Sequence, residues 1–314
     1  MVDVSHAERI VFPEVGRTKG DVVAYYERIA KRMLPHLEGR ALSIKRFPKG
    51  LAAPGFFQKN VPPHYPASIT RHAVAKHTRP TRKNATPEED VTLYPLVHQA
   101  EHLAFLANQG AIELHVPTAR AKDSMRPDRI VFDLDPPAGA LAEVRHAALV
   151  VRDTLAELGL PSAVLATGSK GYHVVAPILA TVDADTIEAA VQQLATLLAT
   201  AHPEALTVAF RIVLRKGRVF LDWLRNRANA SVIAPYSLRA RPQANVATPL
   251  EWSELETTAP DAFTLDDLQR LLDRPDPLAA LAEHPVDPAP FVAAVAERFT
   301  ASGLVLERFD RFRS

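Results

Sequence analysis

Short runs of Ile, Val, Leu and Phe alternate along this chain with longer stretches in which apolar residues recur every three or four positions. The runs are typical of buried strands, and the wider spacing is typical of amphipathic helices. Strands are expected at 42–47, 111–116, 130–135, 172–175 and 218–224, and helices within 22–33, 93–106, 141–158 and 187–198. We expect the first helix to end near Pro35. The pattern predicts an α/β fold of the α+β kind.

From residue 130 onward the predicted order is strand, helix, strand pair, helix, strand. This mixed-sheet layout resembles an RNA-recognition-like half-domain. No internal repeat or long low-complexity linker divides the chain. We therefore expect a single unit over residues 1–314, with approximate halves at 1–120 and 121–314.

Two aspartates interrupt the apolar run Ile130-Val131-Phe132-Asp133-Leu134-Asp135. Residues two apart on a strand share a face, so these carboxylates project together and repel unless a cation lies between them. A divalent metal is the usual partner of such oxygen-rich sites. An isolated Asp-x-Asp is more often a strand end, and Pro136 and Pro137 do end this run. Haloacid dehalogenase-like phosphatases also carry Asp-x-Asp, but they expect Thr or Val at the position of Pro137 and a motif near the domain start.

Two further features strengthen the metal hypothesis. The loop Gly168-Ser169-Lys170-Gly171 precedes Tyr172 and His173, and its glycines, hydroxyl, ammonium and imidazole suit a phosphate. The loop lacks the Gly-x4-Gly-Lys spacing of a Walker phosphate-binding loop. A loop of this composition is a turn between strands about as often as a phosphate site. Asp222 lies inside an apolar run, where a carboxylate costs free energy unless it is paired or metal-bound. Together these residues predict a two-metal site acting on a nucleotide.

Composition narrows the function classes. Of the 314 residues, 47% are hydrophobic, which supports a packed core, and none is cysteine, which excludes disulfides, thiol catalysis and thiolate metal sites. No stretch approaches the ~20 apolar residues of a membrane span. The first residues lack the pattern of a secretory signal. We therefore expect a cytoplasmic protein with no membrane partner.

A net charge of +1 conceals strong segregation of charge. Residues 40–83 contain ten Lys or Arg and no acid, residues 211–241 contain eight against one acid, and residues 251–287 contain ten acids against two Arg. Two basic blocks around an acidic site are the expected footprint of a nucleic-acid enzyme, whereas a merely solvated surface normally mixes both signs. Phe56 and Phe57 lie in the first block, where rings beside cations suit base stacking, although burial of one ring is equally compatible. Arg239 and Arg241 would share a face of an extended segment and could grip a triphosphate.

Several motifs, in order, resemble the polymerase domain of bacterial ligase D, an enzyme of nonhomologous end joining in the archaeo-eukaryotic primase superfamily. The matching segments are Arg17-Thr18-Lys19-Gly20-Asp21, Gly55-Phe56-Phe57-Gln58-Lys59-Asn60, Ile112-Glu113-Leu114-His115, Phe132-Asp133-Leu134-Asp135-Pro136, Gly168-Ser169-Lys170-Gly171-Tyr172-His173, Phe220-Leu221-Asp222-Trp223-Leu224-Arg225-Asn226 and Ala234-Pro235-Tyr236-Ser237-Leu238-Arg239-Ala240-Arg241. The resemblance covers nearly the whole chain and implies a primase-like catalytic core with mixed and antiparallel sheets. Many relatives also carry ligase and phosphoesterase modules, which this sequence lacks. We therefore expect a stand-alone polymerase or an excised domain.

The resemblance also implies roles for individual residues. Asp133, Asp135 and Asp222 match the catalytic carboxylates that bind two divalent ions, manganese in preference to magnesium. The positions implied for nucleotide binding are His115, Ser169, Lys170, His173, Arg239 and Arg241. Those implied for DNA binding are Arg9, Lys19, Lys45, Phe56 and Phe57. Lys19 would hold a downstream 5′-phosphate, with Arg9 where relatives often have lysine, and the two Phe rings would stack on template DNA. Arg225 receives no role.

The activity implied by the resemblance is template-directed extension of primer 3′-hydroxyl ends at gaps and double-strand breaks, with a preference for ribonucleotides. The half 1–120 would bind DNA and the half 121–314 would bind metal and nucleotide. A de novo primase and a DNA-end-binding module with an inactive metal site remain alternatives, and a phosphatase or nuclease is a more distant one. Expected partners are DNA with gaps, overhangs or 5′-phosphates, NTP or dNTP, and, as candidates, Ku and a separate DNA ligase at the nucleoid.

Overall fold

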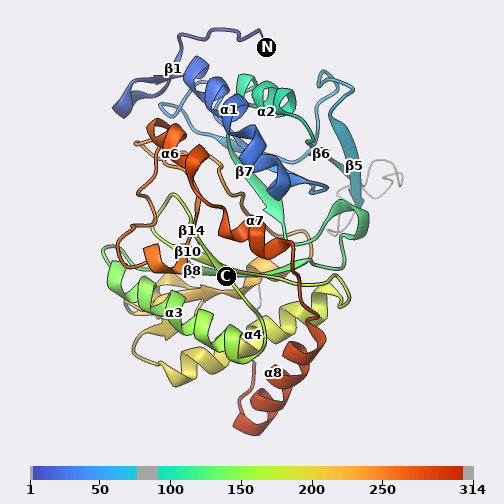
Figure 1. The fold of residues 1–314 in the computed structure, drawn as a ribbon, viewed down its shortest axis with the longest axis vertical. Helices are drawn as coiled ribbons and strands as arrows, with labels where there is room; N and C mark the ends of the chain where they lie inside the picture. The colour runs from blue at the N-terminus through green and yellow to red at the C-terminus, as the bar shows by residue number, and fades with distance from the viewer. Residues whose placement is uncertain (1–2, 76–90, 307–314) are drawn as a thin grey trace.

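The computed structural model describes residues 3–75 and 91–306 (Figure 1). In Figure 1, helices α1 and α2 lie at the top of the view and α3, α4 and α8 at the bottom, with strands β8, β10 and β14 between them. Helices form at α1 (Lys19–Leu37), α2 (Ala100–Asn108), α3 (Leu141–Glu157), α4 (Ala184–Ala201), α5 (Ile212–Arg215), α6 (Leu268–Asp273), α7 (Pro277–Ala282) and α8 (Ala289–Ser302). This α/β architecture with largely antiparallel sheets confirms the predicted fold class.

The first part of the chain builds a four-stranded antiparallel sheet in the order β13-β7-β3-β4. Its strands are β3 (Ser43–Arg46), β4 (Phe56–Gln58), β7 (Ala111–Pro117) and β13 (Ser231–Ile233). Two ribbons lie beside it, formed by β1 (Ile10–Phe12) with β2 (Arg17–Thr18) and by β5 (Thr70–Ala75) with β6 (Val91–Leu96). Strand β13 comes from the second half of the chain, so the two halves share this sheet.

Helix α1 is fixed at both ends by identifiable residues. A capping box begins it, in which Thr18 Oγ1 accepts from the Asp21 amide and the Asp21 carboxylate accepts from the Thr18 amide. The helix ends at Leu37, two residues beyond Pro35, near which its end was expected. Pro35 is tolerated because it lies in the last turn, where it removes a single backbone hydrogen bond and little helix remains to be broken.

The stretch 93–106 contains the expected helix, but its first residues belong to a strand. Residues 91–96 pair with β5 along the whole length of β6, and helix α2 begins only at Ala100. Val91, Thr92 and Tyr94 are residue types that favour the pleated conformation, so their preference decides the local structure.

A six-stranded sheet occupies the second half, in the order β11-β12-β8-β10-β9-β14. Its strands are β8 (Arg129–Asp135), β9 (Ala163–Ala166), β10 (Tyr172–Pro177), β11 (Leu206–Thr207), β12 (Val219–Asp222) and β14 (Thr248–Leu250). Four of them, with α3 after β8 and α4 after β10, follow the βαββαβ order with β8 and β10 at the centre. The expected RNA-recognition-like half is therefore present.

The run 218–224 was expected to be one strand, and the structure ends that strand at Asp222. Residues Trp223–Asn226 form a 3-10 turn instead, and Asp222 Oδ1 accepts from the Leu224 amide at 3.1 Å. The carboxylate thus caps the turn and ends its own strand.

The buried core crosses the boundary near residue 120. One cluster of buried side chains includes Ile29 and Ile112 from the first half together with Phe132 and Leu194 from the second. The Tyr25 hydroxyl also donates to the Tyr236 carbonyl at 2.8 Å, which ties α1 to the second half. Across residues 3–75 and 91–306, no helix is long and apolar enough to span a membrane.

Candidate active site

Three adjacent strands bring the predicted metal-binding residues into one row. Asp133 of β8 pairs with Asp222 of β12 on one side and with His173 of β10 on the other. Directly opposed residues in antiparallel strands have Cβ atoms about 4.5–5.5 Å apart and share a face. Asp135, two residues after Asp133, lies on that face as well. The sheet register therefore gathers all three aspartates and His173.

Arg225 bridges two of these carboxylates. Its Nε lies 3.0 Å from Asp133 Oδ2, and its Nη2 lies 3.1 Å from Asp222 Oδ2. Arg225 received no role from the sequence alone. The only available signal was its place three residues after Asp222, and that spacing brings the two side chains together only because a 3-10 turn follows the strand.

The remaining charges of the row are paired less closely. His173 Nε2 lies 3.4 Å from Asp133 Oδ1. Asp135 faces Lys170 Nζ at 4.0 Å and Arg215 Nη1 at 3.8 Å. Arg215 is a second cation that the sequence analysis did not identify, because it comes from the turn before β12 and reaches the site only through the fold.

Burial and mutual repulsion set the ionisation of the aspartates. Burial raises the pKa of Asp222 to about 6, with Arg225 opposing and the charge of Asp133 adding to the rise. Burial first, and then the charge of Asp133, raise the pKa of Asp135. Burial also opposes ionisation of Asp133, but His173 and Arg225 outweigh it and lower the pKa of Asp133. The site is therefore short of positive charge at two of its three carboxylates.

The chemistry of these donors fits hard divalent cations. Carboxylate oxygens are the preferred ligands of magnesium and manganese, and a cation of higher charge than a guanidinium would favour ionisation of all three groups. Among the described residues, no three His, Asp or Glu side chains stand ready as a metal-holding group. Arg225 instead bridges Asp133 and Asp222, so a metal bound there would displace its guanidinium.

A cavity of about 450 Å³ opens over Asp133 and Asp135. Its size falls within the range of small-molecule sites. All six side chains predicted to bind nucleotide line it, namely His115, Ser169, Lys170, His173, Arg239 and Arg241. The structure thus brings together residues from β7, from the loop before β10 and from the segment after β13.

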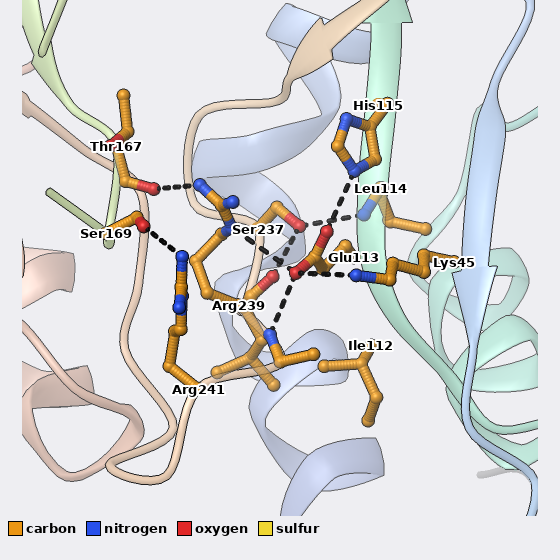
Figure 2. Close-up of polar contacts among 12 residues, drawn as sticks. Lys45, Ile112, Glu113, Leu114, His115, Thr167, Ser169, Ser237, Arg239 and Arg241 are labelled. Atoms are coloured by element: carbon orange, nitrogen blue, oxygen red, sulfur yellow. Dashed lines mark hydrogen bonds and ion pairs between the residues drawn. The ribbon is translucent and has the colours of Figure 1, made fainter. Parts of the chain in front are cut away.

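Two glycines allow the loop 168–171, which is predicted to bind phosphate, to fit closely against its neighbours. A Cβ on Gly171 would lie 2.0 Å from the Leu134 carbonyl oxygen, and a Cβ on Gly168, which has φ of 65°, would lie 2.7 Å from Arg239 Cγ. The loop is then fixed by hydrogen bonds from Arg239 Nη1 to the Thr167 carbonyl, at 2.6 Å, and from Arg241 Nη2 to Ser169 Oγ, at 2.7 Å (Figure 2). The two arginines therefore hold the loop in place and also line the cavity.

Glu113 is a site residue that the sequence analysis did not identify. It is buried beneath the cavity and contacts His115, Arg239 and Lys45, as Figure 2 shows. Its spacing of two from His115 on a strand was the only sequence signal, since the other contacts join distant segments.

Phe56 and Phe57 lie on the edge strand β4, and both are exposed, at 49% and 56%. Neither ring belongs to the core, so the alternative that one was buried is wrong. Arg46 lies 5.7 Å from the centre of the Phe56 ring, and Lys45 Nζ lies 5.8 Å from that of Phe57. Exposed rings beside cations form a surface suited to stacking bases near phosphates.

Arg9 and Lys19 line a second cavity, of about 190 Å³. Lys19 is 7% exposed, and its Nζ donates to the Ser5 carbonyl and hydroxyl at 2.6 and 2.9 Å. Burial first, and then the charge of Arg9, lower the pKa of Lys19. In the part of the chain that the structure describes, neither cation forms an ion pair, so an anion bound between them would relieve this repulsion.

Comparison with known proteins gives one consistent result. The family model for the LigD primase-polymerase domain matches residues 18–278. A multifunctional non-homologous end joining protein LigD of Mycobacterium bovis is 32% identical over 99% of this chain, and one of Mycolicibacterium smegmatis is 35% identical over 91%. The chain spans only 39% and 37% of the lengths of these relatives.

A solved structure agrees with the sequence matches. The polymerase domain from Mycobacterium tuberculosis ligase D in complex with DNA superimposes with a TM-score of 0.79 at 33% identity, covering 91% of this chain and 99% of that one. That domain therefore shares the fold described above, with its mixed and antiparallel sheets. The chain belongs to the family of LigD primase-polymerase domains.

Proposed function

We propose that this nucleotidyltransferase extends the 3′-hydroxyl of a template-paired primer at gaps and double-strand-break ends, with ribonucleotides preferred, in repair by nonhomologous end joining. The observation that carries the proposal is the row of Asp222, Asp133 and His173 across three strands, which lies beside a cavity lined by the phosphate loop. A carboxylate set beside phosphate-binding cations is what phosphoryl transfer to a hydroxyl requires.

Enzymes of this family are metal-dependent nucleotidyltransferases. We assign Asp133 and Asp135 to two divalent ions, manganese in preference to magnesium, and Asp222 to one of them. Such ions would neutralise charge on the α-phosphate and lower the pKa of the attacking hydroxyl. The hydroxyl oxygen bonds to the α-phosphorus as the bond to the bridging oxygen breaks, and pyrophosphate leaves.

The remaining cavity residues hold the triphosphate. Ser169, Lys170 and His173 supply hydroxyl, ammonium and imidazole donors from one loop and the strand that follows it. Arg239 and Arg241 add two guanidinium groups, already oriented by their bonds to that loop. The charge of the triphosphate is thus opposed by groups that need little rearrangement.

The DNA surface is proposed on the first half of the chain. Phe56 and Phe57 would stack on the template, and Lys45 beside them would contact phosphate. Arg9 and Lys19 would hold a downstream 5′-phosphate in the 190 Å³ cavity. The solved relative bound to DNA supports a DNA partner.

The halves 1–120 and 121–314 act as one catalytic unit in this proposal, because the first presents DNA to the metal and nucleotide held by the second. Ku and a separate DNA ligase are the proposed protein partners, at the nucleoid in the cytoplasm. The names of the relatives, which describe end-joining proteins, support the role in end joining.

The test is primer extension on a gapped duplex carrying a 5′-phosphate, with manganese and either NTP or dNTP, for the parent protein and Asp133→Ala. We expect template-matched addition that Asp133→Ala abolishes while binding of the gapped DNA is retained. Addition that persists in Asp133→Ala would contradict the metal assignment. Synthesis of a dinucleotide without primer would favour a de novo primase, and tight DNA binding without addition would favour an end-binding module.

A further inference from the structure

Glu113 is a buried carboxylate on which three cavity residues converge. The residue is only 4% exposed and lies on β7, opposite Lys45 of β3 in the sheet register. His115 Nε2 lies 3.0 Å from Glu113 Oε2, and Arg239 Nε lies 3.4 Å from Oε1. Lys45 Nζ is 3.9 Å from Oε1. Figure 2 shows these side chains approaching Glu113 from different elements.

The three partners come from separate parts of the chain and face the same cavity. Lys45 belongs to β3, His115 to β7 and Arg239 to the segment after β13, and all three line the 450 Å³ cavity with Glu113. The Ala240 amide also donates to Glu113 Oε1 at 3.0 Å, which fixes the backbone next to Arg239. Glu113 therefore joins the first half of the chain to the segment that carries Arg239 and Arg241.

The ionisation of this cluster follows from its contacts. Burial opposes the charge of Glu113, but the His115 hydrogen bond, the charge of Arg239 and the Ala240 amide outweigh it, and the pKa of Glu113 falls to about 2. Burial lowers the pKa of His115, although Glu113 opposes that shift. An ionised carboxylate only accepts hydrogen bonds, so neutral His115 must carry its proton on Nε2. Nδ1 is then left as an acceptor for a ligand.

We propose that Glu113 is the positioning residue of the nucleotide site, which holds His115 and Arg239 in place and fixes the tautomer in which His115 offers Nδ1 as an acceptor to the incoming nucleotide. The inference deepens the proposed function and rests on it. Glu113 itself does not touch the nucleotide and acts through its partners. Its loss should therefore weaken nucleotide use and leave DNA binding unchanged.

The first test needs no measurement of activity and no change to Glu113. The ring nitrogen shifts of His115, measured by ¹⁵N NMR in the free protein at neutral pH, distinguish the two tautomers, and the His115→Gln spectrum assigns the signal. We expect the Nε2-protonated form. An Nδ1-protonated His115 would overturn the inference, whether or not the protein extends primers.

Glu113→Gln provides the second test because it removes the charge at constant shape. If the amide oxygen keeps its bond from Ala240, the amide nitrogen faces His115 and donates to Nε2, which moves the ring proton to Nδ1. We expect the Nδ1 tautomer in this variant, a KM for nucleotide raised at least ~10-fold, and a Kd for gapped DNA within about 2-fold of the parent value. An unchanged KM, or an equal loss of DNA affinity, would refute the positioning role.

Glu254→Gln is the matched control. Glu254 also holds an arginine, accepting from Arg274 through both oxygens at 2.7 Å, but it lines neither the nucleotide cavity nor the cavity of Lys19. It should leave KM unchanged. The double variant Glu113→Gln with His115→Gln provides a further check. Its loss of nucleotide affinity should be smaller than the sum of the losses in the two single variants, because part of the effect of Glu113 passes through His115. Full additivity would show that Glu113 does not act through His115.

Discussion

Asp128 offers a quantitative test of how the two halves are held together. It accepts from Arg40 Nη2 through both oxygens, at 2.7 and 2.6 Å, and from Arg120 Nε at 2.9 Å. Arg40 is 1% exposed, so its charge has no access to water if this partner is lost. We expect Asp128→Asn to lower the free energy of unfolding by about 3–5 kcal/mol, the usual cost of breaking a buried ion pair from one side.

The pKa of Asp128 gives a second estimate of the same effect. Burial opposes its ionisation, but Arg129 and Arg40 outweigh it and lower the pKa from 3.8 to about 2. A shift of this size corresponds to about 2.5 kcal/mol. Because the folded-state pKa is depressed, this stability is present above pH 3.8 and is lost as the pH falls toward 2.

The assay is urea unfolding of the parent and Asp128→Asn at pH 7, repeated between pH 4.5 and 3. At pH 7 the variant should also melt about 5–8 °C below the parent. The difference in unfolding free energy should narrow as the pH falls below about 4. Asp153→Asn is the control, since its ion pair with Arg152 lies on the surface, and it should change stability by at most about 1 kcal/mol. A loss below 1 kcal/mol in Asp128→Asn, or a difference that widens in acid, would refute the reasoning.

Three further predictions concern the site. Lys19→Ala should reduce the preference for gaps with a 5′-phosphate over unphosphorylated gaps without abolishing addition, and equal use of both gaps by the parent would contradict this role. Arg225→Gln should lower the manganese concentration for half-maximal binding several-fold, because the guanidinium competes for Asp133 and Asp222. Electron paramagnetic resonance of free Mn²⁺ measures this binding, and weaker binding in the variant would show that Arg225 supports the metal instead. Gly171→Ala should raise KM for nucleotide about 10-fold or more, since its Cβ would meet a backbone oxygen at 2.0 Å, and an unchanged KM would mean that the loop can shift at no cost.

The strand carrying Asp133 and Asp135 could be predicted from sequence because alternation along one strand needs no information from elsewhere in the chain. The same holds for the helix after it, whose apolar spacing is local. That Asp222 lies opposite Asp133 depends on which strands pair and in which register. The sequence predicted that Asp222 shares a metal site with Asp133, and the strand pairing shows that the two residues lie directly opposite each other.

The contacts of Glu113 and Arg225 could not be predicted in the same way. Glu113 bonds Arg239 across the two halves, and Arg225 reaches Asp133 from a 3-10 turn that begins where strand was still expected. Each contact depends on tertiary geometry that no local pattern encodes. The end of α1 near Pro35 could be predicted, because the constraint that proline places on a helix is local.

The placement of the three carboxylates on two neighbouring strands has a consequence for how this protein tolerates change. Asp133 and Asp222 are held opposite each other by backbone hydrogen bonds between β8 and β12. The chain between these strands also includes β10 and the loop that carries Ser169 and Lys170, so only its remaining loops are free of site residues. Insertions and deletions in those remaining loops should therefore be neutral as long as the register survives. A shift of β12 by a single residue would turn Asp222 to the other face of the sheet. The activity would then be lost although no site residue had been replaced. Variation in length should accordingly accumulate in loops without site residues and be absent within the strands.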